Sequence, residues 1–282
     1  MSPPLGAHVS VAGGLARAFE RGRAIGCDAL QLFVKSPSQW RGRPLGAEET
    51  GAFRTEWAAS GRPPLLAHAA YLINLAATDA EILGRSRAAL ADEAGRCAEL
   101  GVPALVVHPG AHLGAGEAAG LAAVAASLDA VAGELAHCPT RILLELTAGQ
   151  GSVLGSRLEQ LAEIRARAAC RDRLAICLDT CHAFAAGYEV GTAAGVEEFL
   201  AEVERTVGLG LVEGLHLNDS AGERGSRRDR HASIGAGRIG LAGFRRLLAE
   251  PRLASVPMVV ETPLGDDELG HARDLERLRG LL

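Results

Sequence analysis

The fold is decided by residues 104–146, ALVVHPGAHLGAGEAAGLAAVAASLDAVAGELAHCPTRILLEL. This stretch begins with a short apolar run, ALVVHP (104–109), and ends with another, RILLEL (141–146), and both are typical of buried strands. The alanine- and leucine-rich residues 116–136 between them have the length and composition of a helix. A strand, a helix and a second strand in this order predict a βαβ unit with two parallel strands.

The same alternation continues to both ends of the chain. The segments expected to form strands are LGAHVS (5–10), ALQLFV (29–34), LLAHA (65–69), ALVVHP (104–109), RILLEL (141–146), LAICLD (174–179), VEGLHLN (212–218) and VPMVVET (256–262). Helices are expected between them, for example at 78–100 and 116–136, with a last one near 266–281. Eight repeats in 282 residues favour a single α/β domain over residues 1–282, a (β/α)8 TIM barrel, rather than an open sheet with a glycine-rich nucleotide-binding turn.

Composition and charge exclude several classes of protein. With 48% hydrophobic and 22% charged residues the chain can build a full core, which excludes wholesale disorder. No apolar run reaches the roughly 18 residues of a membrane helix, and the start, MSPPLGAHVS, does not resemble a secretory signal, so a cytoplasmic protein with no membrane partner is expected. The six cysteines form no CxxC pair and are expected to be buried thiols. A net charge of -5 gives no general attraction for nucleic acid, so an anionic partner must be bound by a local site.

Imidazoles and carboxylates gather where the expected strands end. His8, His68, His108 and His216 lie at or near four of these ends, and carboxylates occupy the corresponding places in three others. All strand ends of a barrel open onto its C-terminal face, where barrel enzymes have their active sites. The polar stretch 220–240 is unusually long for a structureless loop, which indicates a function for it as well.

So many imidazoles and carboxylates at one end of the barrel indicate a cluster of metal ions. The candidate ligands are His68, His108, Glu145, Asp179, His182, His216, Asp229, His231 and Glu261. Imidazole and carboxylate ligands without thiolate suit zinc, and also manganese or iron where carboxylates dominate. Nine ligands are enough for two or three ions that share a bridging carboxylate, and such clusters hydrolyse phosphoesters. For any one residue, a structural hydrogen bond or salt bridge stays the alternative.

At these same residues the chain resembles the endonuclease IV family, the metal-dependent apurinic/apyrimidinic endonucleases of base-excision DNA repair. The blocks that carry the resemblance are GAHVSVAGG (6–14), HAAYLINLA (68–76), HPGAHLGAG (108–116), ELTAGQGSVLG (145–155), CLDTCHAFAAGYE (177–189), HLNDSAGERGSRRDRHASIGAG (216–237) and VVETP (259–263). Seven blocks in this order, spread over nearly the whole chain, make the match specific.

The resemblance implies three Zn2+ ions per chain, with Mn2+ as an alternative at one position. It implies that His68 and His108 bind one ion and share the bridging Glu145 with a second, which Asp179, His216 and Glu261 complete. It assigns the third ion to His182, Asp229 and His231.

The reaction that the resemblance implies is hydrolysis of the phosphodiester 5′ to an abasic site by a metal-bridging hydroxide. The products are a 3′-hydroxyl and a 5′-deoxyribose phosphate, with repair of blocked 3′ ends as a further activity. Glu145 as the bridge and Glu261 as the group that orients or activates the water are the expected catalytic carboxylates.

The expected partner is double-stranded DNA that contains abasic sites or blocked 3′ ends, and a monomer is expected because the barrel mouth must face the duplex. Gln39, Trp40, Arg41 and Tyr71 are the candidates for insertion beside the extruded nucleotide. The alternatives are a capping turn for residues 35–44 and a packed ring for Tyr71. The candidates for gripping phosphates are Arg224, Arg227, Arg228 and Arg230.

The chain departs from the family pattern at a few positions. Ala70 stands where the block usually has a proline, Leu146 replaces a polar amide, and Ser38 replaces a long basic side chain. Asp266 and Asp267 add negative charge beside the expected DNA face. Two other functions stay open from the residues: a metal-dependent sugar isomerase or epimerase on the same barrel, and a lesion-binding protein without turnover. The DRH motif at 229–231 and the complete ligand set favour the nuclease.

Overall fold

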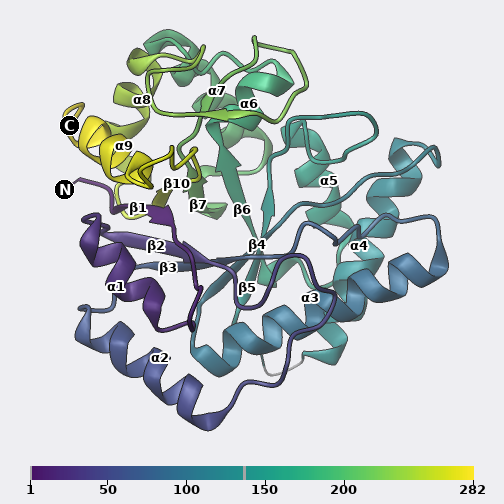
Figure 1. Cartoon of the computed structure of the whole chain (residues 1–282). Coiled ribbons are helices and arrows are strands. Elements are labelled where there is room, and N and C mark those ends of the chain that lie inside the picture. The colour runs from purple at the N-terminus through teal and green to yellow at the C-terminus, as the bar shows by residue number, and fades with distance from the viewer. Residues whose placement is uncertain (1, 136–137) are drawn as a thin grey trace.

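In the computed structural model, which describes residues 2–135 and 138–282, eight parallel strands close into a barrel (Figure 1). The strands are β1 (Leu5–His8), β2 (Ala29–Leu32), β3 (Leu65–His68), β4 (Ala104–Val107), β5 (Arg141–Glu145), β6 (Leu174–Asp179), β7 (Val212–His216) and β10 (Met258–Val260). Each strand pairs with its neighbours along the chain, and β10 closes the ring between β7 and β1. The predicted (β/α)8 barrel is therefore confirmed.

Helices surround this barrel (Figure 1). They are α1 (Arg17–Ala24), α2 (Ala47–Ala59), α3 (Ala80–Leu100), α4 (Glu117–Glu134), α5 (Leu158–Arg167), α6 (Thr180–Ala186), α7 (Ala193–Thr206), α8 (Leu241–Leu248) and α9 (Gly270–Arg279). Short 3-10 turns occur at Arg171–Arg173, Leu209–Leu211 and Pro251–Leu253. The helices expected at 78–100 and 116–136 match α3 and α4, except that residue 136 lies outside the described residues. None of the described helices is both long and apolar enough to cross a membrane.

The ends of α3 follow from local side-chain chemistry. Asp79 precedes the helix, and its carboxylate accepts hydrogen bonds from the amides of Glu81 and Ile82, both at 2.9 Å. This N-cap satisfies amides that have no partner within the helix. Gly101 ends the helix with φ 85°, a left-handed conformation that glycine adopts without steric cost.

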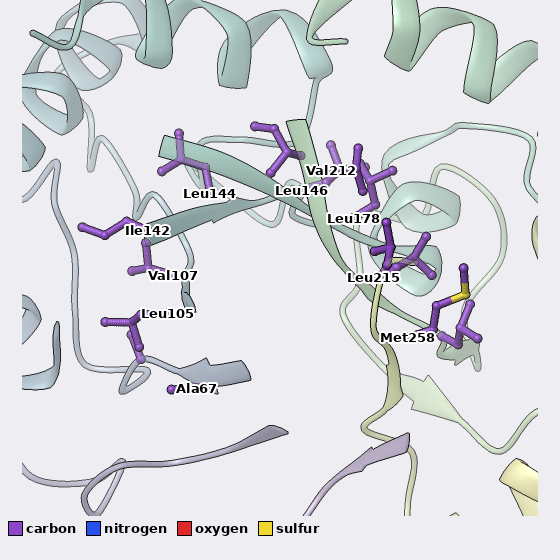
Figure 2. Close-up of a cluster of buried hydrophobic side chains, with 14 of the residues drawn as sticks. Ala67, Leu105, Val107, Ile142, Leu144, Leu146, Leu178, Val212, Leu215 and Met258 are labelled. Carbon is purple, nitrogen blue, oxygen red and sulfur yellow. The ribbon is translucent and has the colours of Figure 1, made fainter. Parts of the chain in front are cut away.

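Side chains alternate between the two sides of the barrel wall. Those that point outward, such as Leu105, Ile142 and Leu144, are buried against the surrounding helices, and Figure 2 shows them set around the wall. The inward positions form a smaller apolar cluster: Leu66, Ala104, Val106, Leu143, Ala175 and Cys177. Above this cluster, towards the C-terminal ends of the strands, the inward positions become polar. The barrel therefore provides a closed apolar floor beneath a ring of imidazoles and carboxylates.

The long stretch after β7 is more ordered than the sequence suggests. Residues Asp219–Ser220 (β8) and His231–Ala232 (β9) form a two-stranded antiparallel ribbon. The buried Asp219 carboxylate accepts hydrogen bonds from the amides of Gly235, Gly237 and Ile239 at 2.8 to 3.1 Å. The ribbon and this carboxylate together hold Asp229 and His231 over the barrel mouth.

Candidate metal centre

The polar ring lies at the C-terminal ends of the strands. His68, Glu145, Asp179 and His216 are the last residues of β3, β5, β6 and β7, and His108 directly follows β4. Each of them comes after an outward-facing apolar residue, so strand alternation points it into the barrel mouth. His182 lies one turn into α6, and its amide donates to the Asp179 carboxylate at 2.7 Å.

The nine residues expected as ligands come together in three groups. Within each group, one nitrogen or oxygen atom per residue lies within 4.8 Å of those of the others. The groups are His68, His108 and Glu145; Glu145, Asp179, His216 and Glu261; and His182, Asp229 and His231. Glu145 belongs to two groups, and this division is the same as the one that the family resemblance implies. A further group, which the sequence did not suggest, joins Cys181 to Asp179 and His231.

Glu145 lies at the centre and is fully buried. Its Oε2 is 3.0 Å from Nε2 of His68 and 3.0 Å from Nε2 of His108. Its Oε1 is 3.0 Å from Nδ1 of His216. A buried carboxylate whose two oxygens face different imidazole pairs is the arrangement of a bridging ligand.

Backbone carbonyls orient several of the imidazoles. The Nδ1 atoms of His68, His182 and His231 lie 2.7, 2.9 and 3.2 Å from the carbonyl oxygens of Ala69, Leu146 and Glu261. A carbonyl only accepts, so each Nδ1 carries a hydrogen, and Nε2 is the atom that presents a lone pair to the mouth when the imidazole is neutral. Metal-binding histidines are usually held in this way.

Two of these Nε2 atoms show whether the site can bind a cation. Nε2 of His182 and Nε2 of His231 are buried and make no hydrogen bond to any described residue. Both lie 3.2 Å from a carboxylate oxygen of Asp229. Buried nitrogens normally have a partner, and a lone pair beside a carboxylate requires a cation or a proton. The three side chains therefore fit a divalent metal ion.

Protonated imidazoles balance the carboxylates when no cation is present. Burial alone would raise the pKa of Glu145, but His108 and His216 outweigh it and hold this pKa well below its usual range. Burial likewise opposes the charge on His231, yet Asp229 and Asp179 raise its pKa to about 9. Burial opposes the charge on Asp229, but the adjacent imidazoles of His182 and His231 outweigh it and lower the pKa of this carboxyl. Metal ions would replace these protons.

Sequence reasoning missed two buried amides that hold the ligands. Gln31 of β2 accepts from Nε2 of His216 at 2.8 Å and donates to Oε1 of Glu261 at 2.7 Å. Asn218 donates to Asp179 at 2.7 Å and accepts from the amide of Glu261 at 2.7 Å. The available signal was a glutamine at an inward position of an otherwise apolar strand.

His8 was recognised at a strand end but was not chosen as a ligand, and it lies beside this network. Its Nδ1 is 3.2 Å from Oε1 of Glu261 and 3.0 Å from Nε2 of Gln31.

The candidate DNA contacts differ in their exposure. Gln39 and Arg41 are exposed, as are Arg227, Arg228 and Arg230. Tyr71 is 66% exposed, so its ring is not buried, and one side of it lies beside the ligand His68 with a ring distance of 5.7 Å.

Two candidates are held by the fold. Trp40 is half-buried and packs against the hydrophobic core, so its ring is largely committed to packing. Arg224 pairs with Glu189 at 2.5 Å, which occupies its guanidinium.

Several of the departures from the family pattern have structural explanations. The carbonyl of Leu146, not its side chain, accepts from His182, and the side chain is buried among the apolar residues in Figure 2. Asp267 pairs with Arg273 at 2.7 Å, so its charge is largely compensated. Ala70 donates its amide to Glu93, a bond that a proline could not make. Ser38 lies 3.0 Å from Ser36 through the two hydroxyls, and nothing in the structure explains Asp266.

A cavity of about 210 Å3 opens beside His68 and His108. Tyr71, Asn74 and Ala111 line it from the loops after β3 and β4. It is the space next to the ligand groups that a small part of a substrate could enter.

Comparisons with known proteins agree with this fold. Residues 19–281 match the family model described as a xylose isomerase-like TIM barrel. A probable endonuclease 4 of Chloroflexus aurantiacus is 48% identical over 280 residues, which covers 99% of this chain and 98% of that protein. A probable endonuclease 4 of Geobacter sulfurreducens is 44% identical, covering 100% of this chain and 95% of that protein.

Solved structures also match the fold of this chain. The endonuclease IV crystal structure from Thermus thermophilus superimposes with a TM-score of 0.85 at 39% identity and covers 99% of this chain and 98% of that one. A D-tagatose 3-epimerase-like protein reaches a TM-score of 0.74 at only 18% identity, covering 99% of this chain and 96% of that one. The second match shows a shared barrel and nothing more.

Proposed function

Because this chain belongs to the endonuclease IV family, we propose that it hydrolyses the phosphodiester 5′ to an abasic site in duplex DNA, leaving a 3′-hydroxyl and a 5′-deoxyribose phosphate. Membership makes the protein a metal-dependent hydrolase, a DNA repair endonuclease. Removal of blocked 3′ ends is part of the proposal. The observation that carries it is the set of three neighbouring ligand groups, two of which share the buried Glu145.

The proposed centre holds three divalent ions, one for each group, with zinc as the expected metal. Histidine and carboxylate ligands fit zinc, and the group that contains Asp229 is the one where manganese is the alternative. Asp229 has 35% of its side chain exposed, whereas Glu145 and Asp179 have none. This third group is therefore the most open to exchange.

Divalent cations in such a cluster act as Lewis acids, which make water more acidic and neutralise charge on the phosphoryl and leaving oxygens. In this proposal Glu261 is the carboxylate that orients or activates the attacking water. Its side chain is 14% exposed at the mouth, whereas Glu145 and Asp179 are fully buried. Gln31 donates to Oε1 of Glu261, which holds the carboxylate in one orientation. Glu145 contributes by fixing the spacing of the first two groups.

The exposed side chains around the mouth give the DNA contacts in this proposal. A sugar within a duplex cannot reach a recessed centre, so the abasic nucleotide must be extruded, which costs least where no base is stacked. Tyr71, Gln39 and Arg41 have exposed side chains, and in this proposal they fill the gap in the duplex. Arg227, Arg228 and Arg230 supply local positive charge for phosphates in a protein of net charge -5.

The two other candidate functions have less support. The sugar epimerases share the barrel at identities near 18%, whereas the endonuclease 4 relatives share 44 to 48% of residues over almost the whole chain. A binding protein without turnover would gain nothing from burying this many charged groups, which are costly without a cation.

The test combines metal analysis with incision of a duplex oligonucleotide that carries one tetrahydrofuran abasic analogue. This analogue cannot undergo β-elimination, so a cut 5′ to it reports hydrolysis. The proposal expects close to three metals per chain, incision at this bond, and loss of incision when a chelator removes the metals. Incision without metals, or metal-loaded protein that binds the lesion and does not cut, would contradict it. A duplex with a 3′-phosphate at a nick tests the 3′ activity separately.

A further inference from the structure

A buried ion pair lies outside the metal centre, between the loop after β2 and helix α3. Nζ of Lys35 is 2.9 Å from Oε1 of Glu93, and the two side chains are only 2% and 1% exposed. Burying two charges costs several kcal/mol of desolvation, so such a pair contributes little net stability and is often kept for specificity.

The lysine holds the first candidate DNA loop. Besides Glu93, the Lys35 ammonium donates to the carbonyl of Gln39 at 2.6 Å and lies 3.4 Å from that of Ser36. These contacts close a turn over residues 36–39, in which the amide of Gln39 also bonds to the carbonyl of Ser36 at 3.3 Å. Gln39 and Arg41 leave this turn with exposed side chains. Lys35 therefore sets the direction in which they project.

The glutamate holds the second candidate DNA loop. Both oxygens of Glu93 accept the amide of Ala70, at 3.2 and 3.0 Å. Ala70 lies between the ligand His68 and the exposed Tyr71. The pair thus connects the loops after β2 and β3 through one continuous set of charged hydrogen bonds, which are stronger than neutral ones.

We propose that Lys35 and Glu93 are positioning residues that fix these two loops in one arrangement and so determine how tightly the protein engages lesion-containing duplex DNA. Bond cleavage itself does not depend on them. The inference rests on the proposed function, because the loops matter in this way only if duplex DNA is the substrate.

The variants are chosen so that the fold survives. Glu93→Gln keeps the size of the side chain and one oxygen for the amide of Ala70, and Lys35→Met keeps the length of the aliphatic stem. In Lys35→Met the remaining glutamate can take up a proton, because burial already raises its pKa. The double variant Lys35→Met/Glu93→Gln leaves no buried charge at this position. Glu250→Gln is the matched control, because Glu250 is also buried and pairs with Arg246 and Arg252 before β10, at the opposite end of the barrel.

The experiment compares two substrates of the full, metal-loaded chain. One is the tetrahydrofuran duplex, and the other is bis(p-nitrophenyl) phosphate, a small diester that has no flanking duplex for the loops to engage. We expect KM for the duplex to rise about tenfold in the double variant, which corresponds to roughly 1.4 kcal/mol. Its kcat, its turnover of the small diester and its metal content should stay within about twofold of wild type, since only interactions made equally with substrate and transition state are lost. Hydrogen exchange should become faster in residues 36–41 and 69–72.

Other outcomes would overturn the inference. An unchanged KM with a lower melting temperature, as expected for Glu250→Gln, would leave the pair a purely structural role. A parallel loss on both substrates, or a loss of metal, would mean that the pair acts through His68 and the cluster. If the wild-type chain does not incise the duplex, both the proposed function and this inference are wrong. If the wild-type chain incises the duplex and the double variant has the same KM, only this inference is wrong.

Discussion

Replacing Gln31 by leucine should weaken metal binding without unfolding the barrel. Gln31 is fully buried and touches two expected ligands of the group that contains Glu145 and Asp179. Its oxygen accepts from Nε2 of His216 at 2.8 Å, which leaves Nδ1 free to bind, and its amide donates to Glu261 at 2.7 Å. Leucine has a similar volume and offers neither atom.

The magnitude follows from these two hydrogen bonds. In the variant His216 loses the partner that selects its tautomer, and Glu261 loses the donor that orients it. A buried polar group left without a partner costs about 1 to 3 kcal/mol. Loss of one such partner behind a metal ligand typically lowers metal affinity about 10- to 100-fold. We therefore expect one of the metals to bind about 10- to 100-fold more weakly, with the others retained.

The assay is competition for zinc between the protein and a chelating indicator, with thermal unfolding of the metal-free chain measured in parallel. Gln160→Leu is the matched control. Gln160 is also a buried glutamine, and its oxygen accepts from the amides of Gly155 and Ser156 at 2.8 and 3.0 Å rather than from a ligand side chain. The control should lose stability and keep its zinc affinity. If Gln31→Leu keeps full zinc affinity and only loses stability, as the control does, then the role assigned to Gln31 is refuted.

Three further changes test separate parts of the structure. Glu145→Ala should lose two metals together, because this carboxylate belongs to two ligand groups, and full metal content on elemental analysis would show that it does not bridge. Glu261→Gln should abolish incision while lesion binding, measured by fluorescence anisotropy, is largely kept; unimpaired incision would remove Glu261 from the mechanism. Asp79→Ala should lower the free energy of unfolding by about 0.5 to 2 kcal/mol through loss of the α3 cap, and it should leave incision unchanged. A smaller loss of stability in a denaturant titration would contradict this role of the cap.

Local patterns were enough to predict the barrel and the positions of its ligands. Strand and helix periods depend on neighbouring residues, so the units around β4, α4 and β5 were recognisable from the sequence. A residue at the end of a parallel strand in a barrel must face the mouth. For this reason the ligands on β3 to β7 could be assigned before their contacts were known.

The regular structure of the stretch after β7 could not be predicted in the same way. Its polar sequence lacks a strand period, and the β8–β9 ribbon is stabilised by Asp219, which binds amides up to 20 residues away. Similarly, nothing in the local sequence distinguishes Trp40, which packs on the core, from its exposed neighbours Gln39 and Arg41.

The sequence by itself therefore determined the class of fold, the family and the residues able to bind metal, because these depend on patterns that each segment carries alone. Only the tertiary structure decided which groups hold those residues in place. Gln31 reaches His216 across 185 residues of chain, and Lys35 meets Glu93 only because the fold brings the loop after β2 to α3. Such partners are selected by barrel closure and strand register, which bring together side chains whose separation along the chain carries no signal.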